Sequence, residues 1–122
     1  MSLSIEEVYQ SLKESLTDRF EIDLFPYTKS FNVIDKDCLS QFDQRLKDYY
    51  IAKVDGRYRF IFRSKFDYLK GLSDEQFDLL KSNDVTIEFF RDQIYLTIFN
   101  VEHDDLAEKI IFLADFLKTV YP

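Results

Sequence analysis

The sequence predicts an α+β fold: an antiparallel sheet of four to six strands, helices packed mainly on one face, and a long C-terminal helix. Two pairs of alternating apolar runs, over residues 49–64 and 85–99, indicate two β-hairpins. Apolar residues at helical spacing follow each hairpin, and others precede a short N-terminal strand. Hairpins favour an antiparallel sheet, and helices that follow them can cover one of its faces. We therefore expect one domain over residues 1–122.

The first hairpin is predicted over residues 49–64, with a turn at Asp55 and Gly56. A type I′ turn needs positive φ at both central positions, which glycine adopts freely and aspartate tolerates. This turn pairs Val54 with Arg57, and side chains then alternate between the two sheet faces. The face toward the core is expected to carry Tyr49, Ile51, Tyr58, Phe60 and Phe62. The outer face is expected to carry Tyr50, Ala52, Val54, Arg57, Arg59, Ile61 and Arg63.

The N-terminal segment predicts a helix followed by short strands. Ser4 and Glu7 have the spacing of a capping box, and apolar residues at helical spacing follow them. Residues 20–25 alternate between apolar and acidic side chains, which predicts a strand that Pro26 ends. A second short extended piece is predicted around residues 31–33.

Two more helices are predicted from their N-terminal signals. Asp35 is expected to cap a helix over residues 35–48. Ser73 and Gln76 have capping-box spacing ahead of a short apolar helix. We expect Asn83 to end that helix, because asparagine tolerates the left-handed conformation.

The C-terminal third predicts the second hairpin, with its turn at residues 91–93, and a long helix over residues 104–121. The apolar arc of this helix is wider than a single contact with a sheet requires. The helix is therefore either the central core helix or partly an oligomer interface. On the second interpretation we predict a homodimer with Ile111 and Phe116 in its interface.

The composition indicates a folded and soluble protein. The chain is 46% hydrophobic and 17% aromatic, which is too apolar for a disordered segment. A single cysteine rules out an internal disulfide and fits a reducing compartment. The chain has no apolar run of membrane-spanning length and no signal-peptide pattern. We therefore expect a cytoplasmic protein that makes no membrane contact.

The charges are unevenly distributed along the chain. The net charge is −7, yet residues 51–72 carry six bases and two acids. The candidate partner-binding residues come from this basic stretch, and they are Arg57, Arg59, Arg63 and Lys65. An acidic partner would suit them, and the alternative is a solvated surface without a partner. The net negative charge repels nucleic acid at long range, and the neighbouring aromatic side chains are predicted to face the core.

No pattern in the sequence predicts catalysis, a cofactor or a metal. A metal site needs several converging ligands, and the chain has one histidine and one cysteine. We expect His103 on the surface and Cys38 in the core, although a Cys38–His103 pair is the nucleophilic alternative. Residues 35–37 resemble the start of a calcium loop, but Ser40 stands where the loop needs glycine. Two glycines are too few for a phosphate-binding loop.

These observations favour a non-catalytic, acidic protein-binding module that acts as an adaptor, an inhibitor or a chaperone-like protein. Its partner is expected to be another protein of unknown identity. Two other functions remain as alternatives. The basic hairpin over residues 49–64 would bind nucleic acid in one of them. In the other, the acidic helices would imitate nucleic acid and block a basic partner protein.

Overall fold

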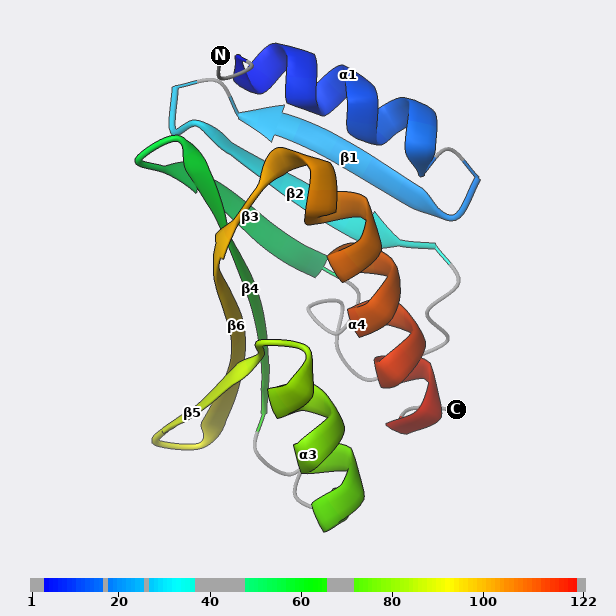
Figure 1. Cartoon of the computed structure of the whole chain (residues 1–122), viewed down its shortest axis with the longest axis vertical. Helices are drawn as coiled ribbons and strands as arrows, with labels where there is room; N and C mark the ends of the chain where they lie inside the picture. Colours follow the sequence, from blue (N-terminus) through cyan, green and yellow to red (C-terminus); the bar gives the residue numbers. More distant parts are fainter. Residues whose placement is uncertain (1–3, 17, 26, 37–47, 66–71, 121–122) are drawn as a thin grey trace.

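The computed structural model confirms the predicted fold class and describes residues 4–16, 18–25, 27–36, 48–65 and 72–120. Six antiparallel strands form one sheet in the order β1-β2-β3-β4-β6-β5 (Figure 1). The described elements are α1 (Ile5–Ser15), β1 (Phe20–Phe25), β2 (Ser30–Asp35), β3 (Asp48–Val54), β4 (Arg57–Lys65), α3 (Asp74–Ser82), β5 (Thr86–Phe90), β6 (Gln93–Val101), the 3₁₀ helix η2 (His103–Asp105) and α4 (Leu106–Val120). Among these described helices, none is long and apolar enough to cross a membrane.

The β3–β4 hairpin has the predicted turn and register. Asp55 and Gly56 both have positive φ, 52° and 79°, as a type I′ turn requires. Val54 lies opposite Arg57, and Ile51 lies opposite Phe60. The predicted alternation is therefore confirmed for the described side chains. Ile51, Tyr58, Phe60 and Phe62 are buried on the inner face.

The first two strands also form a hairpin. β1 begins and ends where the alternation predicted, and its inward residues pair with those of β2. Phe31 and Val33, expected only in a short extended piece, are completely buried in β2. Asp35 is the last residue of β2, where its carboxylate accepts hydrogen bonds from Arg19. Asp35 therefore ends a strand and binds Arg19, and the prediction that it caps a helix is wrong. Most of the predicted helix over residues 35–48 lies outside the described residues.

The β5–β6 hairpin differs from the prediction at its turn. Phe90 lies opposite Gln93, so the turn has two residues and Gln93 belongs to β6. Arg91 has a φ of 57°, the conformation that this tight turn needs at its first position. β6 also extends beyond the predicted strand end, as far as Val101. The longer strand can pair with β5 on one side and with β4 on the other.

Both predicted capping boxes are present. Ser4 accepts a hydrogen bond from the backbone N–H of Glu7, and the Glu7 side chain accepts one from the backbone of Ser4. The same reciprocal bonds join Ser73 and Gln76 at α3. Each cap is worth about 1 kcal/mol. The residue with positive φ after α3 is Asp84 rather than Asn83, because Asn83 is still the C-cap.

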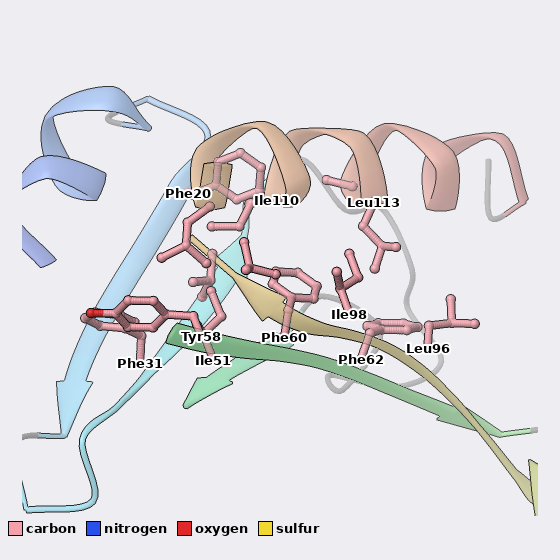
Figure 2. Packing of buried hydrophobic residues seen from close by; sticks show 14 of the residues in the cluster. Phe20, Phe31, Ile51, Tyr58, Phe60, Phe62, Leu96, Ile98, Ile110 and Leu113 are labelled. Atoms are coloured by element: carbon pink, nitrogen blue, oxygen red, sulfur yellow. The ribbon is translucent and has the colours of Figure 1, made fainter. Parts of the chain in front are cut away.

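The hydrophobic core lies between the sheet and helices α1 and α4. Figure 2 shows Ile110 and Leu113 of α4 above Phe60 and Phe62 of β4. All four side chains are fully buried. Residues from α1, α3 and the inner faces of the strands complete the same cluster. The helices therefore occupy one face, as predicted, and the opposite face of the strands is the outer face of the sheet.

The side chain of Tyr58 puts a polar group into this core. Tyr58 is 2% exposed, and its ring stacks on Phe31 with 6.0 Å between the centroids. Tyr9 of α1 stacks on Phe31 from the other side at 6.3 Å. The Tyr58 hydroxyl is buried without a hydrogen-bond partner among the described residues. Burial accordingly raises the pKa of Tyr58 above its ordinary value.

Tyr58→Phe is expected to keep or increase stability at pH 7 and to protect the protein at high pH. A buried, unpaired hydroxyl costs about 1–3 kcal/mol, so its removal costs little. Because the pKa of Tyr58 is raised only in the folded state, both states are protonated below about pH 10, and stability falls as the pH rises above that value. Urea unfolding measures the free energy of unfolding of both proteins at pH 7 and at pH 10.5. The difference in favour of the variant should be larger at pH 10.5. Tyr27→Phe is the control, because Tyr27 is fully exposed. If Tyr58→Phe lowers the free energy of unfolding by more than about 1 kcal/mol at pH 7, the hydroxyl has a hydrogen-bond partner.

Candidate functional site

The outer face of the sheet gathers exposed apolar side chains from different strands. Phe25 of β1 is 47% exposed, Tyr50 and Val54 of β3 are 41% and 45% exposed, and Phe99 of β6 is 48% exposed. Isolated exposed apolar residues are normal on a protein surface, and a group of them indicates an interaction site. The register of the sheet decides whether these four residues form such a group.

The register places two arginines among the apolar residues. Phe25 lies opposite Ser30, which lies opposite Ala52, which lies opposite Arg59. Ser30 and Ala52 are small and buried, so Phe25 and Arg59 supply most of the exposed surface of this row. The next row along the same strands pairs Val54 with Arg57. We call this group the outer patch, and its members are Phe25, Tyr50, Val54, Arg57, Arg59 and Phe99.

A β-bulge lies beside Phe99 of the outer patch. The pairing of β4 with β6 shifts between Tyr58, which lies opposite Val101, and Phe60, which lies opposite Ile98. Two residues of β6, Phe99 and Asn100, therefore lie opposite Arg59 alone. Asn100 has a φ of 56°, which asparagine tolerates better than most residues. Alternation along β6 puts Phe99 on the outer face, and the bulge returns Val101 to the inner face opposite Tyr58.

The two arginines of the outer patch have different surroundings. The Nε atom of Arg57 lies 2.9 Å from Oε1 of Glu102, and both side chains are about half exposed. The Arg59 side chain is half-buried, and its Nε is buried without a hydrogen-bond partner among the described residues. A buried donor on a charged group that lacks an acceptor is unfavourable. Arg57 therefore already holds a carboxylate, whereas no acceptor for the buried Nε of Arg59 lies among the described residues.

The other predicted partner-binding residues continue the same strand. Arg63 and Lys65 lie opposite Tyr95 and Gln93 of β6. Their side chains lie outside the described part of the structure, so the outer patch is defined without them.

A second polar cluster joins distant parts of the chain. Arg19 binds Asp35 through two hydrogen bonds of 3.2 Å, and its third nitrogen donates to Asp115 of α4 at 2.6 Å. Burial by itself would lower the pKa of Arg19, but the hydrogen bonds and charges of Asp35 and Asp115 outweigh it and raise that pKa. Arg19 also lies over the ring of Phe20 at 5.1 Å. Its hydrogen bonds connect β2 with α4, which indicates a structural role.

An open pocket of about 270 Å³ lies beside this cluster. Ile111 lines the pocket and is 40% exposed. Phe116, the other predicted interface residue, is 5% exposed because it packs into the core. The homodimer prediction therefore depends on Ile111 and stays a prediction.

The described structure includes only some of the residues considered for catalysis or metal binding. His103 is partly exposed in η2, and its Nε2 lies 2.8 Å from Oδ1 of the adjacent Asp104. Cys38 lies outside the described residues. Within residues 4–16, 18–25, 27–36, 48–65 and 72–120, no group of three metal-ligating side chains forms.

Reasoning from the sequence found part of the outer patch. It placed Tyr50, Val54, Arg57 and Arg59 on one face, because a single hairpin determines their relative positions. It did not connect Phe25 or Phe99 with them, because that requires the order of the strands. The sequence did contain one signal. Phe25 and Phe99 alternate with the inward-facing apolar residues of their own strands, which places both on the opposite face. Comparison with protein-family models, curated proteins and solved structures finds no match to this chain.

Proposed function

We propose that this protein is a non-catalytic binding module whose outer patch docks an acidic segment of a partner protein. The observation that carries the proposal is the combination of four exposed apolar side chains with Arg57 and Arg59 on the outer face. Aromatic residues and arginine are enriched where proteins bind each other, and they supply most binding hot spots. The apolar side chains provide area to bury, and the arginines provide charge-assisted hydrogen bonds.

The charge distribution supports an acidic partner. Arg57 and Arg59 belong to a basic stretch in a chain whose net charge is −7. An acidic segment is attracted to this stretch and repelled by the rest of the molecule, which favours one orientation at encounter. Oppositely charged surfaces also increase the association rate and exclude partners of the wrong charge. As part of the same proposal we place the protein in the cytoplasm, where its single cysteine would stay reduced.

A second candidate function uses the same residues. Tyr50 and Phe99 are aromatic, exposed and close to Arg59 in the register of the sheet. Single-stranded nucleic acid binds on exposed aromatic rings beside basic residues. We favour the protein partner because a net charge of −7 opposes nucleic acid, and because the exposed Val54 offers no ring for a base to stack on.

Selection of displayed random peptides tests this function without a known partner. Peptides are selected on the wild-type protein and counter-selected on Arg59→Gln/Phe99→Ser. We expect enriched sequences that combine Asp or Glu with aromatic or aliphatic residues. A synthetic peptide of the consensus should bind Arg59→Gln about tenfold more weakly, since hydrogen bonds to charged groups contribute about 1.5–3 kcal/mol. The matched control is Arg91→Gln, an exposed arginine in the β5–β6 turn.

Each outcome of this experiment has a clear meaning. Enrichment of basic peptides, or equal binding to the wild type and the double variant, would refute an acidic partner at the outer patch. Fluorescence anisotropy with a labelled single-stranded oligonucleotide separates the second candidate. Binding that weakens with salt and is lost in Arg59→Gln would favour nucleic acid over protein.

A further inference from the structure

The ion pair between Arg57 and Glu102 belongs to the outer patch by position. Tyr58 lies opposite Val101 in the pairing of β4 with β6. The residues one step further, Arg57 and Glu102, therefore face each other across the two strands, and 2.9 Å separates Nε from Oε1. Arg57 also lies opposite Val54 on its other side. A carboxylate of the protein itself thus occupies the guanidinium next to the exposed apolar side chains.

This ion pair contributes little to folding stability. The Arg57 and Glu102 side chains are 55% and 53% exposed. Ion pairs at such exposure are worth about 0–1 kcal/mol, because water screens the charges and two long side chains lose freedom. Glu102 can therefore leave Arg57 at small cost when another carboxylate arrives. Arg59 differs from Arg57, because no acceptor for its buried Nε lies among the described residues.

We propose that Glu102 is an internal competitor that holds Arg57 until a carboxylate of the partner replaces it. This inference rests on the proposed function and adds its regulation: Arg59 anchors the incoming acidic segment, and Glu102 sets the affinity. The exchange replaces one exposed Arg57–carboxylate pair with another of similar strength. Arg57 therefore adds almost nothing to the affinity for the partner while Glu102 is present.

The exchange predicts a specific dependence between two substitutions. Arg57→Gln alone should leave the affinity for the acidic consensus peptide nearly unchanged. Glu102→Gln should raise it about threefold, because Arg57 then binds the partner without competition. In the Glu102→Gln background, Arg57→Gln should remove this gain. Such a double-mutant cycle isolates the coupling between the two residues from their separate effects.

Glu88→Gln is the matched control for charge. Glu88 is exposed on β5 and lies opposite Tyr95, so its side chain is on the outer face away from Arg57. Glu88→Gln removes one negative charge, as Glu102→Gln does. Both substitutions therefore weaken the long-range repulsion between the protein and the acidic peptide equally. Glu102→Gln should strengthen binding more than Glu88→Gln does, and only the Glu102→Gln effect should disappear when Arg57 is replaced.

A spectroscopic measurement tests the exchange itself. The NMR signal of the Glu102 side-chain carboxylate carbon should shift when wild-type protein is saturated with the acidic peptide, and the Glu88 signal should not. If peptide binding depends on Arg59 but Glu102→Gln behaves like Glu88→Gln, the competitor inference is wrong and the proposed function stands. If no peptide binding depends on Arg59, the proposed function itself fails.

Discussion

Arg19→Ala is expected to lower the free energy of unfolding by about 3–5 kcal/mol, the usual cost of removing one partner from a buried ion pair. Asp35 is 2% exposed, and Arg19 donates two hydrogen bonds to its carboxylate. Without the guanidinium, this carboxylate keeps its burial but loses two hydrogen bonds and a neighbouring positive charge. Urea unfolding followed by circular dichroism measures the loss.

Two further variants test the physical cause. Asp35→Asn combined with Arg19→Ala should recover part of the loss, since the buried negative charge is then absent. Asp115→Asn should cost less than about 1 kcal/mol, because Asp115 is 60% exposed and water screens its pairing with Arg19. Equal costs for Arg19→Ala and Asp115→Asn would contradict a dominant role for the buried pair.

Phe60→Ala should have an effect of similar size through packing. Phe60 is completely buried in β4, between β3 and β6 and beneath α4 (Figure 2). Replacing a buried phenylalanine with alanine costs about 3–5 kcal/mol, because transfer free energy is lost and a cavity remains. Thermal and urea unfolding should both show the loss.

The outer face supplies a matched control for this substitution. Phe99→Ala removes the same atoms from β6, but Phe99 is 48% exposed. We expect that variant to lose at most about 1 kcal/mol, since little apolar area leaves the core. If Phe60→Ala does not fold, Phe60→Leu should still fold and lose about 1.5 kcal/mol. Equal losses for Phe60→Ala and Phe99→Ala would show that the two faces are not distinguished by burial.

The sequence predicted those features that depend on neighbouring residues. The Asp55-Gly56 turn determines the register of β3 and β4, because two residues with positive φ leave one way to join the strands. The capping boxes at Ser4 and Ser73 likewise involve residues three positions apart. In each case the interacting groups lie within a few residues of one another, so their spacing was sufficient.

Features formed between distant residues were not predicted. The role of Asp35 depends on Arg19, 16 residues earlier, and on the burial of both by the folded sheet. From local spacing alone, Asp35 resembled a helix cap. Membership of Phe25 and Phe99 in the outer patch depends on which strands are neighbours. No local pattern records that β6 pairs with β4 as well as with β5.

The position of β6 has a consequence for the order of events during synthesis. The four N-terminal strands can pair in sequence as soon as each has left the ribosome, but β4 gains its second neighbour only when β6 follows. Until then β4 is an edge strand with open backbone groups, and it carries Phe60 and Phe62 without their β6 partners. A nascent chain that ends at β5 therefore presents an aggregation-prone edge. When β6 is complete, it pairs with β4, and β5 becomes the edge strand on that side of the sheet. β5 is shorter than β4 and therefore exposes fewer backbone groups.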